Sequence, residues 1–158
     1  MNEKIEICIK KCEDMKKYAD IVDNATFYML RKFKDGRPAV KMEFMQNCGD
    51  NVIDEEAVYF FKFYGEVELC FNKIGTSTRN VISRLRDEIG EYSKKFDIRR
   101  VEICCIRACG GMPPEGIESL LRAEFIKQYP TAFRKNDRFF GVNIETEVFN
   151  EICNQYFG

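Results

Sequence analysis

The sequence predicts an α+β fold, a small β-sheet with flanking helices, and two observations lead to it. Short apolar runs typical of strands are interspersed with longer segments that repeat apolar residues at helical spacing. Between residues 57 and 129 these segments follow one another as strand, strand, helix, strand, helix, which indicates a compact sheet with helices packed on it. With 158 residues, 45% of them hydrophobic, the chain can fold around a real core.

The first 50 residues predict a β-α-β extension of that core. Residues 4–10 alternate apolar and charged side chains as a strand does, residues 11–34 have helical spacing, and residues 39–45 alternate again. We therefore divide the chain into an N-terminal extension, residues 1–50, and a second domain, residues 51–158.

The second domain begins with a predicted β-hairpin, because apolar runs over 57–63 and 67–75 flank a Tyr-Gly-Glu turn. A helix is expected after the hydroxyl residues 76–78, which suit an N-cap. The remaining expected elements are a strand over 98–109, a helix over 114–129 with the apolar stripe Ile117, Leu120, Leu121 and Phe125, a loop over 130–138, and a helix over 145–156.

Histidine is absent from the chain, and this excludes Ser-His and Cys-His catalytic pairs as well as zinc sites that need imidazole. A general base must then be Tyr, Lys, Asp, Glu or Cys. The eight cysteines contain no CxxC pair, and Cys104, Cys105 and Cys109 match no usual zinc spacing. With no signal-peptide pattern and no apolar run near the ~18 residues of a membrane span, we expect a cytoplasmic protein with free thiols and no membrane contact.

The charge of the chain is unevenly distributed although the net charge is only −1. Residues 73–138 hold 14 basic and 9 acidic side chains, whereas residues 1–72 hold 11 basic and 14 acidic ones. A basic middle section fits an anionic partner bound by one face, and it equally fits ordinary variation in a charged protein.

A short block after the hairpin, Lys73-Ile74-Gly75, leads directly into the helix that carries Arg79 and Arg84. A helix start offers free N–H groups to an anion, and arginine can hold a phosphate with two parallel hydrogen bonds. The same pattern is also typical of a solvated helix face. Tyr59 in the first hairpin strand and Glu118 in the first turn of a later helix have equally ordinary interpretations, as core packing and as a complement to the helix dipole.

The order of Tyr59, Lys73, Arg84 and Glu118 resembles the GIY-YIG nuclease superfamily. In that family the hairpin strands carry the two name-giving tripeptides, an arginine follows on the first helix, and a metal-binding glutamate lies on a later helix. Here Val58-Tyr59-Phe60 and Lys73-Ile74-Gly75 stand in the two tripeptide positions. The chain is most similar to a divergent branch found in phages, viruses and some restriction enzymes, in which lysine replaces the second tyrosine. That branch often ends its domain with a charged residue and an aromatic pair, as Asp137-Arg138-Phe139-Phe140 does.

The resemblance implies a metal-dependent endonuclease that hydrolyses phosphodiester bonds in DNA. Glu118 would bind one Mg²⁺ or Mn²⁺ ion per active site, and Arg84 would neutralise charge on the phosphoryl oxygens. Tyr59 would take the proton from the attacking water, with Lys73 lowering the phenol pKa or orienting the water. Tyr64, near the hairpin turn, is an alternative base.

Basic side chains around this site are then expected to contact backbone phosphates, and the candidates are Arg79, Arg107, Arg134, Lys135 and Arg138. One active site cuts one strand, so double-strand cleavage would need a homodimer or two sequential nicks. Three other interpretations stay open: an inactive nucleic-acid-binding protein on the same fold, a regulatory protein without nucleic-acid binding, and an unrelated enzyme with Cys109 as its nucleophile.

Overall fold

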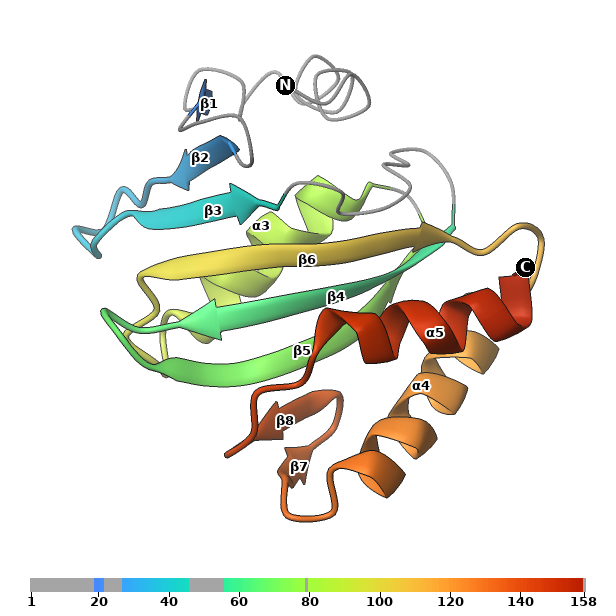
Figure 1. Ribbon diagram of the computed structural model, residues 1–158. Coiled ribbons are helices and arrows are strands. Elements are labelled where there is room, and N and C mark those ends of the chain that lie inside the picture. Colours follow the sequence, from blue (N-terminus) through green and yellow to red (C-terminus); the bar gives the residue numbers. More distant parts are fainter. Residues whose placement is uncertain (1–18, 22–26, 46–55, 79, 158) are drawn as a thin grey trace.

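A computed structural model describes residues 19–21, 27–45, 56–78 and 80–157 of the chain, and Figure 1 labels its elements. It confirms the predicted α+β class. The described elements, in chain order, are β1 (Ala19–Ile21), β2 (Phe27–Arg31), β3 (Val40–Phe44), β4 (Ala57–Tyr64), β5 (Leu69–Ser77), α3 (Val81–Tyr92), β6 (Arg100–Ala108), α4 (Pro114–Gln128), β7 (Phe133–Lys135), β8 (Arg138–Phe140) and α5 (Thr146–Phe157).

All the described strands belong to one sheet, in the order β1-β2-β3-β6-β4-β5-β8-β7. The β3–β6 pair is parallel and every other neighbouring pair is antiparallel. The hairpin strand β4 therefore lies inside the sheet, with β5 on one side and β6 on the other.

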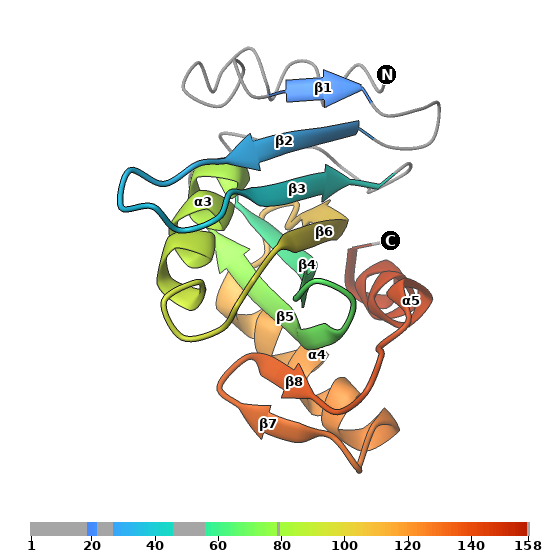
Figure 2. The same cartoon turned by 90° about the vertical axis from the view of Figure 1, so that its left-hand side faces the viewer.

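The sheet has helices on both faces, and this explains why β4 is an unbroken apolar run. Figure 1 shows α3 behind the sheet and α5 in front of it, and Figure 2 shows the same arrangement from the side. Tyr59 and Phe61 of β4 pack in the cluster that includes α3, whereas Val58 and Phe60 pack in the cluster that includes α4 and α5. Successive side chains of a strand point to opposite faces, so a strand covered on both sides must be apolar throughout.

The predicted hairpin and the three predicted helices of the second domain are confirmed, with small shifts in their ends. In the stripe of α4, Ile117, Leu121 and Phe125 are buried as expected, but Leu120 is 39% exposed and does not belong to it. Leu120 lies between Ile117 and Leu121 in the sequence, but the helix turns by about 100° per residue and places it beside the buried stripe.

The predicted helix over residues 11–34 is wrong where the structure describes that range, because β1 and β2 lie within it. Residues 27–31 are rich in aromatic and large apolar side chains, which suit a strand, and they pair along their whole length with β3. The predicted strand over 39–45 is confirmed as β3, and the one over 4–10 lies outside the described residues. The described part of the N-terminal extension thus continues the sheet of the second domain as a meander.

Part of the predicted loop over residues 130–138 forms the first strand and the turn of a short hairpin, β7–β8. Its turn places Asn136 at a φ of 55°, a left-handed conformation that asparagine tolerates better than most residues. Arg134 supports the turn by donating from Nη1 to the Asn136 carbonyl oxygen at 2.7 Å. The hairpin matters for the site because β8 pairs with β5 at Asn72 and Lys73.

The five cysteines in the described part of the chain, Cys70, Cys104, Cys105, Cys109 and Cys153, are free thiols, and all but Cys70 are buried. Of the helices described, none is both long and apolar enough to cross a membrane.

Candidate active site

The site begins with a close contact between Tyr59 on β4 and Gly75 on β5, which are direct cross-strand partners. Tyr59 is completely buried, and its ring stacks on Phe61 with centroids 4.2 Å apart. A Cβ atom at position 75 would lie 2.7 Å from Tyr59 Cε1 and would overlap the rest of the phenol. Only glycine at position 75 lets the phenol cross the second strand, and this explains why the Lys-Ile-Gly block ends in glycine.

The phenol reaches a buried carboxylate, Glu88 on α3. Tyr59 donates its hydroxyl hydrogen to Glu88 Oε1 across 2.5 Å. The same oxygen lies 3.7 Å from Lys73 Nζ and 3.7 Å from Arg84 Nε. Three of the four predicted catalytic residues therefore meet at one carboxylate that sequence reasoning missed. The sequence does contain a signal for Glu88, because it is an acidic residue between Leu85 and Ile89 on the apolar stripe of the helix.

Burial is the main influence on the pKa values of Glu88 and Tyr59. Burial raises the pKa of Glu88, against the opposing effects of Lys73 and Tyr59. Burial also raises the pKa of Tyr59, and the neighbouring Glu88 raises it further. Arg84 acts to lower the phenol pKa, but burial and Glu88 outweigh its effect. At neutral pH Tyr59 therefore stays protonated and acts as a hydrogen-bond donor.

The alternative base, Tyr64, lies at the other end of β4 in a separate cluster. Its hydroxyl donates to Glu102 Oε1 at 3.0 Å, and the guanidinium carbon of Arg100 stands 3.7 Å from its ring centroid. Burial raises the pKa of Tyr64 as well. It shares no contact with Lys73 or Arg84 and does not join the site.

Lys73 connects the Glu88 cluster to a second pair of carboxylates. Its ammonium lies 3.9 Å from Asp137 Oδ2, on the turn between β7 and β8. The Asp137 backbone is fixed by a hydrogen bond from Ile74 N to its carbonyl oxygen, 3.1 Å long. Arg122 of α4 places Nη2 at 2.8 Å from Asp137 Oδ1 and at 3.5 Å from Glu118 Oε1. Asp137 and Glu118 thus share one arginine.

The two carboxyl groups also share a proton. Burial raises the pKa of Glu118 to about 7, and the hydrogen bond to Asp137 and the charge of that residue contribute. For Asp137, burial acts to raise the pKa, but the hydrogen bond from Glu118 and the charges of Lys73 and Arg122 outweigh it and lower the value. Two neighbouring acids behave in this way, because one ionises readily and the other keeps its proton to a higher pH.

The structure therefore brings all four predicted catalytic residues into one polar network. It runs from Arg84 through Glu88, Lys73 and Asp137 to Glu118, with Tyr59 attached at Glu88. The helices α3 and α4 cover opposite faces of the sheet, but α4 also packs against β5. Lys73 lies on β5 and its ammonium contacts both Glu88 and Asp137. The Glu118 side chain, 12% exposed, is part of this network and not of the apolar core.

The Glu118–Asp137 pair also provides the protein oxygens that a divalent cation would use. Mg²⁺ is commonly held by one or two carboxylates and keeps several waters. A cation would replace the shared proton and remove the repulsion between the two acids. Within the described residues there is no cluster of three or more His, Cys, Asp or Glu side chains that could hold a metal ion.

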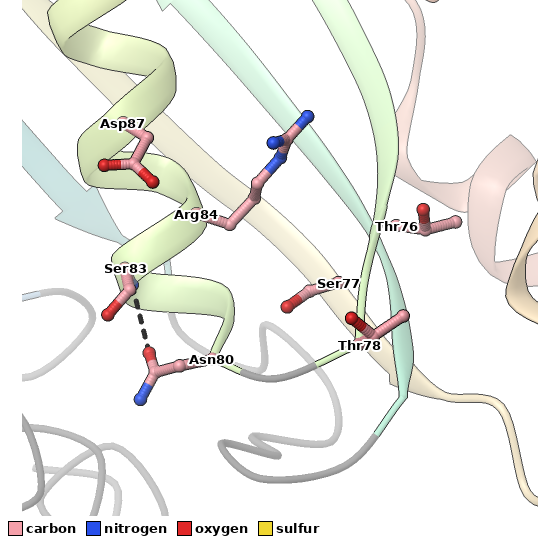
Figure 3. Close-up of a pocket in the computed structure, with 7 residues that line it drawn as sticks. All are labelled: Thr76, Ser77, Thr78, Asn80, Ser83, Arg84 and Asp87. Atoms are coloured by element: carbon pink, nitrogen blue, oxygen red, sulfur yellow. Dashed lines mark hydrogen bonds between the residues drawn. The ribbon is translucent and has the colours of Figure 1, made fainter.

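A cavity of about 580 Å³ lies beside Arg84, between the end of β5 and the first turns of α3 (Figure 3). Its walls are formed by Thr76, Ser77, Thr78, Asn80, Ser83, Arg84 and Asp87. Asn80, and not the hydroxyl residues 76–78, caps the helix, because its Oδ1 accepts from Ser83 N at 3.0 Å.

The predicted phosphate-binding residues have different surroundings. Arg134 and Lys135 are exposed on β7, and Arg107 donates from Nη1 to Asn154 Oδ1 at 3.0 Å. Arg138 is buried over the rings of Tyr92 and three phenylalanines, which leaves little of its side chain exposed for the predicted contact with phosphates. Arginine next to an aromatic pair instead stabilises the core through its guanidinium plane. Arg79 lies outside the described residues.

Cys109 lacks the properties of a nucleophile. It is buried, and burial raises the pKa of its thiol to about 11, so very little thiolate forms at neutral pH.

Comparison of the chain with protein-family models, with curated proteins and with solved structures found no match. A function for the site must therefore be inferred from the contacts, burial and charges of its own residues.

Proposed function

We propose that the chain is a metal-dependent endonuclease that hydrolyses phosphodiester bonds in DNA by a GIY-YIG-type mechanism. One observation carries this proposal: the cations Arg84 and Lys73 and the acids Asp137 and Glu118 belong to one continuous network. Phosphodiester hydrolysis needs positive groups to neutralise the phosphoryl oxygens and carboxylates to hold a cation. The network offers both within one small region.

Glu118 and Asp137 are the residues that would hold one Mg²⁺ or Mn²⁺ ion. When bound, the ion would polarise the scissile phosphate and ease deprotonation of the attacking water. Because the ion would take the place of the proton on this pair, Glu118 has to lose that proton, near pH 7, before the ion can bind.

Arg84 is the cation best placed to contact the substrate. Its side chain is 52% exposed, and Glu88 lies 3.7 Å from its Nε atom. An anchored and partly exposed guanidinium can neutralise charge that develops on a phosphoryl group without first having to reorganise. Lys73 is only 8% exposed, so we expect it to hold Glu88 and Asp137 in place and not to contact the substrate directly.

Tyr59 has a different role in this mechanism from the one that the resemblance implied. Its hydroxyl hydrogen is committed to Glu88 and its pKa is raised. Tyr59 therefore positions Glu88, which in turn positions Arg84 and Lys73.

Nicking of supercoiled plasmid tests the proposal. The wild-type chain should nick with Mg²⁺ and stop with a chelator, and Glu118→Gln or Arg84→Ala should each slow nicking on the order of 10²-fold or more, as loss of one charge stabiliser does. Matched controls are Glu115→Gln, in the first turn of α4, and Arg86→Ala, on α3; both should nick like the wild type. Folding of each variant is checked by circular dichroism. Unchanged nicking by Glu118→Gln would refute the assigned role.

A second candidate is a nucleic-acid-binding protein on the same fold that does not cleave. The burial of Tyr59 and the internal pairing of Glu118 with Asp137 and Arg122 favour it. Salt-sensitive DNA binding without nicking in Mg²⁺ or Mn²⁺ would identify this function instead.

A further inference from the structure

We propose that the cavity beside Arg84 is a subsite for the nucleotide next to the scissile phosphodiester bond. This inference rests on the proposed function. It assigns a contact surface for the substrate to residues outside the polar network, and it names nucleotides as the ligand class.

The size and lining of the cavity suit a nucleotide. Its volume of about 580 Å³ is within the range of small-molecule sites, roughly 300–1,000 Å³. Four residues with hydroxyl side chains line it, Thr76, Ser77, Thr78 and Ser83, although Figure 3 shows the Thr76 side chain pointing away from α3. Hydroxyl groups both donate and accept hydrogen bonds. Sugar, phosphate and base edges need such mixed partners.

Arg84 belongs to both the network and the cavity. Its Nε atom lies 3.7 Å from Glu88, while half of the side chain is exposed at the cavity wall. In Figure 3 the side chain extends from α3 toward β5, across the space above Ser77 and Thr78. A phosphodiester held by Arg84 has one sugar on each side, and the sugar on this side enters the cavity.

Asp87, on the rim of the cavity, determines which part of the nucleotide lies there. It is exposed, and its carboxylate repels phosphate oxygens. The phosphate is therefore expected at Arg84, and the nucleoside, whose hydroxyl and amino groups can donate to a carboxylate, near Asp87. The helix start itself is not the binding group, because Asn80 already accepts from the Ser83 N–H.

Binding of a deoxynucleoside 3′,5′-bisphosphate to the full chain without divalent cations tests this inference by isothermal titration calorimetry. The double variant Thr78→Val with Ser83→Ala removes two hydroxyls from the cavity and leaves the Asn80 cap intact. It should bind the bisphosphate on the order of tenfold more weakly, as expected for the removal of two hydrogen bonds. Thr131→Val, at an exposed position far along the chain, is the matched control and should bind like the wild type.

Inorganic phosphate distinguishes the cavity from Arg84 itself. Phosphate affinity should be the same in the wild type and the double variant, because neither hydroxyl is needed to bind a phosphate at Arg84. Equal bisphosphate affinity in all variants, or no bisphosphate binding by the wild type, would overturn the subsite.

The outcome is separable from that of the proposed function. If the bisphosphate binds and the double variant weakens it while plasmid nicking is absent, the subsite stands and the nuclease proposal fails. If the plasmid is nicked but the double variant binds the bisphosphate as well as the wild type, the nuclease stands and the subsite is wrong.

Discussion

The proton shared by Glu118 and Asp137 links the activity of the site to pH. The pKa of Glu118 is raised from 4.5 to about 7, so below that pH the group is neutral and a weaker cation ligand. The nicking rate at limiting Mg²⁺ should therefore rise with pH through about 7. In Asp137→Asn the neighbouring charge is gone and the rise should move to lower pH, which a pH–rate profile measures; an unmoved midpoint would contradict the shared proton.

The contribution of Glu118 to the stability of the fold should fall with rising pH, whereas its contribution to the nicking rate should rise. Because the folded pKa of Glu118 is above its unfolded value, its stabilising contribution is present below pH 4.5 and is lost as pH rises through about 7. Added Mg²⁺ should raise the melting temperature above pH 7 and have little effect at lower pH, because ligands stabilise the state that binds them. Glu118→Gln should abolish this shift in a thermal melt; a shift that persists would place the ion elsewhere.

Tyr59→Phe separates the positioning role of the phenol from a role as base. The change removes one donor from buried Glu88, whose Oε2 atom already has no hydrogen-bond partner among the described residues. It should lower the free energy of unfolding by about 1–3 kcal/mol, measured by urea denaturation. The pH–rate profile should keep its rise near pH 7, because the phenol does not titrate there. Full stability together with complete loss of nicking would instead identify Tyr59 as the base.

At the scale of elements, the hairpin depends on Gly75. Gly75→Ala would place a methyl group on the buried ring of Tyr59, and relieving that overlap should cost about 1–3 kcal/mol or more in the free energy of unfolding. Gly90→Ala in α3 is the control, since no described residue comes within 4 Å of a Cβ atom there. It should stabilise the protein by about 0.5–1 kcal/mol through helix propensity. Equal urea midpoints for the two variants would exclude the overlap.

The strands and helices that carry the site residues can be predicted from the sequence, whereas the contacts between those residues cannot. The hairpin, the helix with Arg84 and the helix with Glu118 were predicted because periodicity and turn residues are local signals. Glu88 and Asp137 were missed as site members because their roles depend on neighbours far away in the chain. Residues 27–31 were misread for a similar reason: helical spacing was outweighed by pairing with β3, which a local pattern cannot reveal.

At the scale of the whole molecule, the exposed cations of β7 should contribute to binding DNA. Arg134 and Lys135 are exposed on the edge strand, and the next turn carries Asp137 of the network. Replacing both with alanine should reduce the slope of log affinity against log salt by about 1 for each phosphate that the protein no longer neutralises. Arg99→Ala is the control, because that arginine is already paired with Asp97 at 2.8 Å. Fluorescence anisotropy across a salt series measures the slope, and an unchanged slope would place the DNA on another face.

The parallel pairing of β3 with β6 affects how the chain folds while it is being synthesised. Synthesis releases β3 first, but its partner emerges only after the hairpin and α3 have been made. Until then Val40, Met42 and Phe44, all buried in the finished sheet, have no strand beside them on that side. During translation the early meander must wait for the later core, so a nascent chain stalled before residue 100 should bind chaperones that the released full-length chain no longer needs.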